Sequence, residues 1–490
     1  MKLILILLII LLIFLCNNYF SFENFFITKK TEYFTPIDAL TSVKDKKNIV
    51  KLFKQCIQII EDNNIEYWII GGTLLGSIRD KGLISWDDDA DIAIMKEHIN
   101  KILLLEDEFK KYNIGLISWF GGYKLYDLDG TIIKGRNFKF PFVDIFIEIK
   151  NNDIYMFESE IANERWPLEK YKYDDIFPVK RYEYEDFQVY GPNKGLEMVN
   201  KIYSGWQNSA LKIYDHTTHT KTIEYKFKID YDYTKKPYMW LYWDNKNENN
   251  KNNPAIIDLC YDTVVKHCNE SFEIVRLNKD NIESYIPELK HYKKYMNNLI
   301  IAHKVDIYRI MLLYKYGGIY LDSDIIVFKD PVEIMDKLKK YDFVGFGCTG
   351  YECKNGYGKP SNWLLASRPN TNLIGHILNK QLEIIEKNKK LDYHDIGKML
   401  IWQELDKLFN QEYEYYHYPN TIDGTRDKKG KWVTTERLFS NEKIEYDNEK
   451  DMLFCVYYNS IDININKLTR NEILSKDWNI TKFIKKSLQI

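Results

Sequence analysis

Two groups of aspartates interrupt apolar stretches of this 490-residue chain. In the first, Asp89 and Asp91 alternate with apolar residues, so a strand would place both carboxylates on one face. Asp144 later interrupts an apolar run. Burying a charge there costs free energy, so we expect this residue to serve a function. Adjacent carboxylates repel unless a cation lies between them. Oxygen ligands suit Mg²⁺ or Mn²⁺ that bridge to substrate phosphates, so the pattern predicts such a metal site.

A glycine turn precedes the first aspartates. The strand-like run 67–70 leads into Gly71-Gly72, and a helix then starts with Thr73 and Ser77. Glycines let backbone N–H groups approach an anion, and a helix N-terminus favours negative charge. The two hydroxyls add donors. Taken singly, a double glycine is most often a plain turn and an acidic run a solvated loop, so only the ordered set indicates chemistry.

The second group, Asp322 and Asp324, follows the short predicted strand 319–321. Upstream, Asp306 and Arg309 lie three residues apart and share one face of an apolar helix. They could form a buried ion pair, although such pairs stabilise a fold poorly. Two carboxylates at the end of a strand can hold a divalent cation against a diphosphate. This cation would stabilise charge on a departing nucleoside diphosphate.

Composition limits the alternatives. The net charge is −2, and the sequence has no long basic run, so we expect no nucleic-acid partner. Seven cysteines include the close pairs Cys260/Cys268 and Cys348/Cys353. Their spacing does not fit a zinc knuckle, and a disulfide stays open.

The N-terminus carries an apolar run, Leu3–Cys16, preceded by Lys2. This run fits a signal-peptide core and is short for a spanning helix. The residues that follow, Asn17-Asn18, do not form a small-x-small cleavage site. We therefore favour an uncleaved signal anchor at 1–30 over a cleaved signal, and we expect a single-pass protein of a secretory, Golgi-like lumenal membrane or an equivalent host membrane.

The elements that must position these residues form two α/β patterns without an internal repeat. An amphipathic helix is expected at 44–63, followed by mixed strands and helices, which gives a first domain at 44–215. The charged stretch 216–236 has no core pattern and is taken as a linker. A second α/β pattern fills 237–465, and 466–490 is taken as a tail.

The first domain resembles the LicD/fukutin-related family, which has the polymerase-beta-like nucleotidyltransferase fold. The resemblance covers about 48–206 and rests on Gly71–Arg79, Ile84–Ile92, Phe177–Lys180, Tyr190–Pro192 and Tyr203–Trp206. The family transfers a phospho-alcohol from a CDP-linked donor to a glycan. The resemblance implies that Asp89, Asp91 and Asp144 hold the metal, with Asp87 a further ligand. It also implies phosphate contacts, from Gly71, Gly72, Thr73, Ser77 and Lys124; Lys124 could equally be a surface lysine.

The second domain resembles glycosyltransferases with a DXD motif, of the capsular polysaccharide synthesis and initiating mannosyltransferase type. The resemblance rests on the Asp306/Arg309 helix, Tyr316–Asp324 and the opening strand Met239–Trp243. It implies a GT-A α/β sandwich and a nucleotide-sugar donor bound with Mn²⁺ or Mg²⁺. Asp306 and Arg309 would contact the donor, Asp322 would contact metal and ribose, and Asp324 would ligate metal. Further candidates are Trp243 for the nucleotide pocket, although a strand tryptophan is more often core, and Asn362 and His394 beside the substrates.

Three functions remain open from the sequence. The favoured one is a bifunctional enzyme that adds a sugar and a phospho-substituent to the same glycan. The second has one active domain and one binding module. The third, a non-catalytic glycan-binding membrane protein, is disfavoured by two carboxylate clusters in matching contexts.

Overall fold

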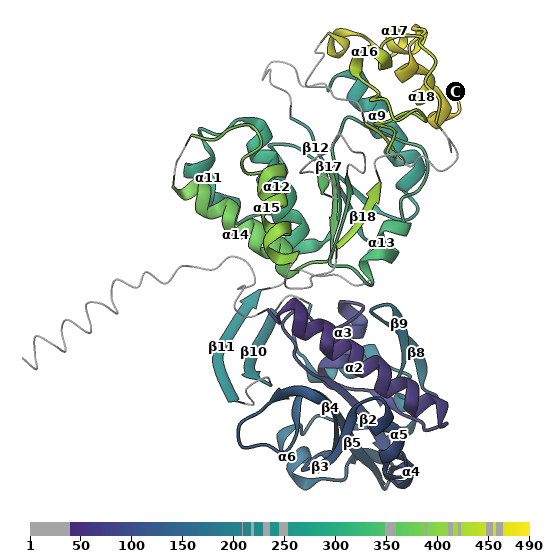
Figure 1. The fold of residues 1–490 in the computed structure, drawn as a ribbon, viewed down its shortest axis with the longest axis vertical. Coiled ribbons are helices and arrows are strands. Elements are labelled where there is room, and N and C mark those ends of the chain that lie inside the picture. Colours follow the sequence, from purple (N-terminus) through teal and green to yellow (C-terminus); the bar gives the residue numbers. More distant parts are fainter. Residues whose placement is uncertain are drawn as a thin grey trace, which may run out of the picture.

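The computed structural model describes residues 40–207, 209–216, 220–228, 236–244, 253–347, 359–387, 390–409, 415–419, 423–446, 454–456 and 464–490. They form two mixed α/β parts, one at each end of the view in Figure 1. Among the described residues, no helix combines the length and the apolar character needed to cross a bilayer. The anchor predicted at 1–30 and the Cys348/Cys353 pair lie outside these residues, whereas Cys260 and Cys268 are buried and are not joined by a disulfide.

The N-terminal part is built on a seven-stranded sheet with the order β1-β2-β5-β4-β3, and β6 joins β5 to β7. Its strands are β1 (Trp68–Ile69), β2 (Ala90–Met95), β3 (Ile114–Trp119), β4 (Gly122–Ile132), β5 (Lys139–Asn151), β6 (Ile154–Phe157) and β7 (Lys170–Tyr171). β2 and β5 run parallel, and β4 lies antiparallel to β5. The hairpin of β8 (Lys180–Tyr184) and β9 (Phe187–Gly191) is separate.

Helix α2 (Val43–Asp62) matches the amphipathic helix predicted at 44–63. It starts at Ser42, whose hydroxyl accepts the backbone N–H of Asp45, as an N-cap does. Phe53 and Ile60 are fully buried in the N-terminal core, as the helical spacing of the apolar residues predicts. The remaining helices are α3 (Gly71–Arg79), α4 (Ile99–Leu104), α5 (Glu106–Lys111), α6 (Glu160–Arg165), α7 (Tyr173–Ile176) and α8 (Gly195–Ile202).

The predicted linker at 216–236 is not a plain connector. β10 (Ser209–Asp215) and β11 (Thr220–Lys228) pair as an antiparallel hairpin, which Figure 1 draws beside the N-terminal part. The sequence prediction missed β11 because it required an alternating core pattern. A two-stranded ribbon is held by backbone hydrogen bonds and needs no such pattern.

The C-terminal part has a six-stranded sheet with the order β13-β12-β14-β17-β16-β18. Its strands are β12 (Tyr238–Tyr242), β13 (Glu273–Leu277), β14 (Gly318–Leu321), β16 (Phe343–Gly347), β17 (Pro360–Ser367) and β18 (Tyr415–Pro419); β15 (Ile325–Val327) pairs with β19 (Phe454–Val456). One face of the sheet packs through Trp240 and Tyr320 against one hydrophobic core, and the other face packs through Leu241 and Leu321 against another. This is the α/β sandwich expected from the sequence.

The helices of this part are α9 (Ala255–Cys268), α10 (Ile282–Tyr285), α11 (Leu289–Met296), α12 (Ile301–Tyr316), α13 (Glu333–Leu338), α14 (Asn372–Glu386), α15 (Lys398–Phe409), α16 (Thr435–Leu438), α17 (Arg470–Ser475) and α18 (Asn479–Leu488). The structure corrects the predicted tail at 466–490. Ile473, Ile480 and Ile484 on α17 and α18 are fully buried in one core with Ile256 and Cys260 of α9. The segment is therefore an integral layer of the C-terminal part.

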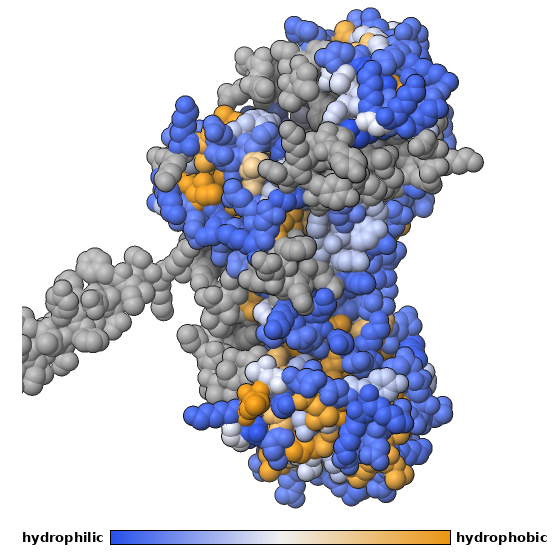
Figure 2. All heavy atoms as spheres, viewed as in Figure 1, coloured by the Kyte–Doolittle hydropathy of each residue, from blue (hydrophilic) through white to orange (hydrophobic). Residues whose placement is uncertain are grey.

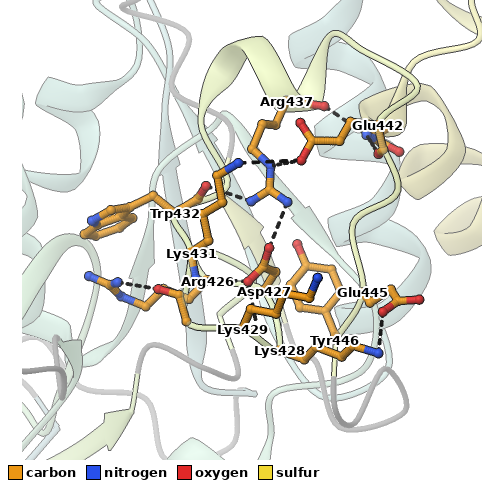
Figure 3. A network of polar contacts seen from close by, with 12 residues as sticks. Arg426, Asp427, Lys428, Lys429, Lys431, Trp432, Arg437, Glu442, Glu445 and Tyr446 are labelled. Atoms are coloured by element: carbon orange, nitrogen blue, oxygen red, sulfur yellow. Dashed lines mark hydrogen bonds and ion pairs between the residues drawn. The ribbon is translucent and has the colours of Figure 1, made fainter.

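Polar contacts hold the irregular segment 423–446 together (Figure 3). The Asp427 carboxylate accepts an N–H from Arg437 at 2.8 Å and backbone N–H groups from Lys429 and Lys431 at 2.9 Å each. Arg437 also donates to Glu442 at 3.0 Å. A buried arginine of the short helix α16 and the carboxylates around it thus stabilise a region that is otherwise largely irregular.

Charged side chains join the two parts. Arg368 of the C-terminal part is bonded to Glu185 of the N-terminal part at 2.9 Å and to Asp342 at 2.8 Å. Asn372 donates to the carbonyl of Thr41. Lysines of α2 line a cleft at this junction; its residues are Lys46, Lys47, Val50, Lys51, Lys54, Glu185, Asp186, Lys340, Asp342 and Arg368.

The face in Figure 2 is mainly hydrophilic, and hydrophobic atoms gather on its lower end. By the ribbon in Figure 1 this end belongs to the N-terminal part. That part includes exposed hydrophobic residues on and after α6, namely Ile161, Trp166 and Leu168.

A buried carboxyl on β5 makes stability depend on pH. Burial, together with the nearby Glu169 carboxylate, raises the pKa of Glu148 from 4.5 to about 8. The folded chain therefore binds more protons than the unfolded chain between these values, and its stability falls as pH rises through this window, by at most about 1.4 kcal/mol per unit. We expect Glu148→Gln to raise the melting temperature at pH 9 and to change it little at pH 5.

The control for this experiment is Glu164→Gln, because Glu164 is exposed on α6. Its melting temperature should follow that of the wild type at both pH values. Equal shifts of Glu148→Gln at pH 5 and pH 9 would contradict the role given to Glu148 ionisation.

Candidate functional site

The acidic centre of the N-terminal part consists of Asp87, Asp88, Asp89, Asp91 and Asp144. Carboxylate oxygens of Asp89, Asp91 and Asp144 lie within 4.8 Å of one another. The register explains this, because Asp91 of β2 stands directly beside Asp144 of the parallel strand β5. The structure thus brings together the three aspartates that the sequence singled out.

Lys124 completes the row of charges across three strands. It stands opposite Asp144 on β4, and its Nζ lies 2.5 Å from Oδ1 of Asp144. Only 2% of Lys124 is exposed, which excludes the surface-lysine alternative. Its ammonium group also lies 3.7 Å from the centre of the Phe142 ring.

The electrostatics of the acidic centre favour a bound cation. Burial, followed by the charges of Asp89 and Asp144, raises the pKa of Asp91 well above its usual value. Burial also raises the pKa of Asp144 to about 6, although Lys124 opposes this. Carboxyl groups that are costly to ionise become good ligands once a divalent cation supplies the missing charge. The donor set therefore fits Mg²⁺ or Mn²⁺, which both prefer oxygen.

The N-terminus of α3 faces the acidic centre. Gly71 has a φ of +56°, and a Cβ atom added to it would lie 3.2 Å from Oδ2 of Asp91. A Cβ on Gly72 would stand 2.5 Å from Oδ2 of Asp87. Side chains at these two positions would therefore push the carboxylates away from the helix N-terminus.

The two hydroxyls predicted at this turn have protein partners. Thr73 Oγ1 accepts the backbone N–H of Asp91 at 2.8 Å, so it holds the start of β2 in place. Ser77 donates to the carbonyl of Glu183 at 2.9 Å and is 1% exposed. The structure therefore gives Ser77 a bond to β8 in place of the expected position towards a phosphate.

A histidine that the sequence reasoning missed also reaches the acidic centre. His216 follows β10, and its ring nitrogens lie 2.6 Å from Asp88 and 3.2 Å from Asp89. Burial lowers the pKa of His216, but the charges of Asp89 and Asp88 outweigh this and raise it to about 10. No local signal marks His216 in the sequence, because it lies at the edge of the predicted linker.

The second centre lies at the end of β14 and is formed by Asp306, Arg309, Asp322 and Asn362. Arg309 Nη2 lies 3.4 Å from Asp306 and 3.3 Å from Asp322, and Asn362 donates to Asp306 at 2.6 Å. Burial raises the pKa of Asp322 to about 6, although Arg309 opposes this. We call this group the arginine centre.

Backbone geometry fixes the arginine centre at the edge of the sheet. Gly317 and Gly318 have φ values of +68° and +92°, which only glycine adopts readily, and they end α12 and start β14. The hydroxyl of Ser323 donates to the carbonyl of Tyr242 at 2.9 Å. This bond ties the Asp322-Ser323-Asp324 turn to the end of β12, just before Trp243.

The remaining predicted residues of this part lie at different depths. Trp243 is half-buried against the core that contains α9, as the alternative of a core tryptophan predicts. Asp324 is half-exposed on the turn. The segment 392–397 passes close to the arginine centre. A Cβ added to Gly397 would lie 2.3 Å from Oδ2 of Asp306. His394 belongs to this segment, and burial lowers its pKa.

Buried polar atoms at the arginine centre point to a polar ligand. Among the described residues, Arg309 Nε, Asn362 Oδ1 and the Tyr320 hydroxyl are buried without a hydrogen-bond partner. Such atoms cost free energy unless a ligand or water satisfies them. Arg309 also lies 4.7 Å from the centre of the Tyr320 ring, so these groups belong to one locality. Arg309 Nε can donate to an acceptor of a ligand, Asn362 Oδ1 can accept from a donor, and the Tyr320 hydroxyl can do either.

The glycines next to the acidic centre give a testable contrast. In Gly72→Ala the new Cβ meets a side chain, Asp87, which can shift. In Gly76→Ala the Cβ meets the backbone carbonyl of Gly82, which cannot shift without moving the chain. We expect Gly72→Ala to lower any phospho-transfer about tenfold or more, with a change in stability of about 1 kcal/mol or less.

Gly76→Ala should instead lower the melting temperature of the N-terminal part by several degrees. Thermal unfolding followed by circular dichroism, together with an assay of each transfer, separates the two effects. A loss of stability in Gly72→Ala as large as that in Gly76→Ala would contradict the assignment of Gly72 to the acidic centre.

Two family models match the chain. The model described as LicD/FKTN/FKRP, nucleotidyltransferase domain, matches residues 64–194, and that of the capsular polysaccharide synthesis protein matches residues 193–471. The first match contains all five aspartates of the acidic centre, and the second contains the arginine centre. His216 lies outside the first match.

Individual relatives are similar to parts of the chain. An uncharacterised protein of Rickettsia prowazekii is 30% identical over 194 residues, which cover 38% of this chain and 67% of that protein. The chain therefore spans about two thirds of the length of this relative. The lipopolysaccharide cholinephosphotransferase LicD of Haemophilus influenzae is 23% identical over 208 residues, 35% of this chain and 78% of that protein.

Among solved structures, the glycosyltransferase GlyE of Streptococcus pneumoniae is similar at a TM-score of 0.29 and 16% identity, over 52% of this chain and 63% of that one. The two family matches identify a transferase enzyme. The longer match extends over more than half of the sequence, so the chain belongs to the capsular polysaccharide synthesis protein family, and a LicD-type nucleotidyltransferase domain precedes this module.

Proposed function

We propose that the chain is a bifunctional glycan-modifying transferase. Its C-terminal part, with a GT-A fold, transfers a sugar from a nucleotide sugar. Its N-terminal part, with a polymerase-beta-like nucleotidyltransferase fold, transfers a phospho-alcohol from a CDP-type donor to a glycan. The observation that carries the proposal is the presence of two separate polar centres, each built from buried charges that a metal-bound diphosphate would satisfy.

At the acidic centre, Asp89, Asp91 and Asp144 would hold a divalent cation. When bound, the cation neutralises charge on the diphosphate and on its departing oxygen. Lys124 keeps Asp144 oriented through their 2.5 Å contact. The N-terminus of α3 directs backbone N–H groups towards the same space, where a phosphate is favourable.

At the arginine centre, Arg309 carries a fixed positive charge between Asp306 and Asp322. It positions Asp322, while Asp306 and Asn362 keep the guanidinium in place. The unsatisfied Tyr320 hydroxyl and Asn362 Oδ1 would meet polar groups of the donor. Asp322 and Asp324 supply carboxylates for a cation that balances the donor diphosphate. Tethering both centres in one chain raises the local concentration of a shared acceptor.

One observation favours a second candidate, a glycosyltransferase whose N-terminal part only binds. In the described structure, Lys124 and His216 contact acids of the acidic centre. These contacts balance part of the carboxylate charge without a metal, as is expected of a domain that binds a ligand but catalyses no transfer. The main proposal includes a single-pass membrane location, which the apolar run Leu3–Cys16 supports.

A donor-binding screen tests the proposal. UDP-, GDP- and CDP-linked donors would be titrated with Mn²⁺ into the full chain by calorimetry, and into Asp89→Ala and Asp324→Ala. We expect CDP-alcohol binding to disappear only in Asp89→Ala and sugar-nucleotide binding to disappear only in Asp324→Ala. Absence of CDP-alcohol binding in the wild type would leave the second candidate, and loss of both ligands in either variant would contradict separate centres.

A further inference from the structure

His216 contacts the acidic centre through both its backbone and its ring, although it comes from the hairpin between the two parts. Its backbone N–H donates to Oδ2 of Asp88 at 2.8 Å, and its ring Nδ1 lies 2.6 Å from Oδ1 of the same carboxylate. Its ring also forms a T-shaped contact with Phe142 of β5, with 5.8 Å between the ring centres. Backbone, ring nitrogen and ring edge together fix the direction of the imidazole.

This fixation determines which nitrogen faces the acidic centre. Because a carboxylate accepts hydrogen bonds, we assign the Nδ1 proton to the bond with Asp88. Nε2 is then the nitrogen directed at Oδ2 of Asp89, 3.2 Å away. Without a metal, a proton on Nε2 lies between this nitrogen and the carboxylate oxygen, and a bound cation takes the place of that proton. Two ligands at about 2.1–2.2 Å from one metal ion, at right angles to each other, stand roughly 3 Å apart. The observed separation matches that spacing.

The arrangement is that of a metal-ligating histidine with an orienting carboxylate. Histidines that bind metals through one nitrogen usually donate the other N–H to a carboxylate or a carbonyl, which fixes the tautomer and raises ligand basicity. Here Asp88 is 5% exposed and Asp89 8% exposed, so both carboxylates are withheld from bulk water. Asp88, Asp89 and His216 offer ligand atoms within 4.8 Å of one another, and Asp89 also belongs to the group with Asp91 and Asp144.

We infer that Nε2 of His216 is a ligand of a divalent transition-metal cation that Asp89 also binds, and that Asp88 is the outer carboxylate that orients the ring. The inference rests on the metal-binding acidic centre of the proposed function. Imidazole suits transition metals better than Mg²⁺, which prefers oxygen ligands. His216 therefore gives the acidic centre a preference for Mn²⁺ over Mg²⁺, and the hairpin completes a centre that residues 64–194 do not supply in full.

The test uses the full chain in an Asp324→Ala background, so that the arginine centre contributes little bound metal. Mn²⁺ alone is the probe, and pulsed electron paramagnetic resonance detects magnetic coupling between Mn²⁺ and a directly bound nitrogen. We expect this ¹⁴N coupling in the Asp324→Ala chain, its loss in the added variant His216→Ala, and its retention in the added control His291→Ala. His291 is exposed on α11, in the other part of the chain.

A second measurement guards against misfolding of the variant. Titration calorimetry should show Mn²⁺ affinity lowered by His216→Ala at least as much as by loss of an outer-shell partner, about 10- to 100-fold or more, with Mg²⁺ affinity changed less than about threefold. Asp88→Asn retains the shape of the orienting side chain. It should also lower Mn²⁺ affinity, but by a smaller factor than His216→Ala does. Unchanged circular dichroism would confirm that both variants fold.

The outcomes separate this inference from the proposed function. A chain without ¹⁴N coupling, or with coupling that survives His216→Ala, overturns the ligand role of His216. If Asp91→Asn still abolishes Mn²⁺ binding in that case, the acidic centre itself stands. If Asp91→Asn leaves Mn²⁺ binding intact, the metal-binding centre of the proposed function is wrong.

Discussion

Asp324→Ala is expected to lower sugar transfer by about 10³-fold or more while leaving phospho-transfer unchanged. Asp322 already shares Arg309 with Asp306, at 3.3 and 3.4 Å from the guanidinium nitrogen. We therefore assign to Asp324 the larger share of the charge that holds the cation. Losing one cation-binding carboxylate removes several kcal/mol of charge stabilisation from the transition state, which corresponds to roughly this factor.

Initial rates of sugar release from the nucleotide donor measure the effect, and the donor dissociation constant is measured in parallel. The matched control is Asp336→Ala on α13, because Asp336 is an exposed acid whose carboxylate pairs with Lys339 at 3.1 Å. It should retain wild-type rates. Sugar transfer by Asp324→Ala within tenfold of the wild type would remove Asp324 from the metal site.

Asp322→Asn offers a comparison within the same turn. Its amide retains the shape of the carboxylate but leaves Arg309, which is 5% exposed, without one of its two anions. We expect a weaker affinity for the donor together with a lower melting temperature, whereas Asp324→Ala should leave the melting temperature nearly unchanged. The difference follows from burial, because breaking a buried ion pair costs much more than losing a half-exposed charge.

The sequence predicts the arginine centre well because its signals are local. Asp306 and Arg309 share a helix face, and Gly317-Gly318 can only end that helix and open a strand. The parallel pairing of β12 with β14 then carries the Asp322-Ser323-Asp324 turn to the same edge as Trp243. The sequence names His394 as a candidate beside the substrates, but no local pattern predicts the close approach of Gly397 to Asp306. This approach depends on the packing of α14 and α15.

The acidic centre likewise contains some residues that the sequence predicts and others that it does not. Alternation along one strand suffices to put Asp89 and Asp91 on one face, and strand pairing brings Asp144 beside them. The hydroxyl of Ser77 turns to β8 because α3 packs there, which a helical pattern alone does not reveal. His216 illustrates the largest gap, because a contact between residues 128 positions apart depends on where a two-stranded ribbon folds back.

Asp91→Asn is expected to abolish phospho-transfer and at the same time to stabilise the metal-free chain. Burial and the charges of Asp89 and Asp144 make the ionised form of Asp91 costly. A neutral amide of the same shape removes this cost, so the melting temperature of the metal-free N-terminal part should rise by about 2–4 °C. Sugar transfer should stay at the wild-type rate, because the arginine centre does not use Asp91.

The measurement combines thermal unfolding with and without Mn²⁺ and an assay of each transfer. Mn²⁺ should raise the melting temperature of the wild type through binding to the folded state, and it should have little effect on the N-terminal transition of the variant. Asp129→Asn, at an exposed position of β4, is the matched control and should respond to Mn²⁺ as the wild type does. Phospho-transfer by Asp91→Asn above about 1% of the wild-type rate would exclude Asp91 from the metal site.

Asp144→Asn should be equally inactive but should shift stability in the opposite direction. Its carboxylate lies 2.5 Å from Lys124, and this lysine is 2% exposed, so the substitution leaves a buried ammonium group without its anion. Breaking such a pair costs about 3–5 kcal/mol, and the melting temperature should fall. Two inactive variants with opposite shifts in stability would indicate a cation site, in which the ionised Asp91 is costly until metal binds. In a purely structural ion-pair network, both substitutions would instead destabilise the fold.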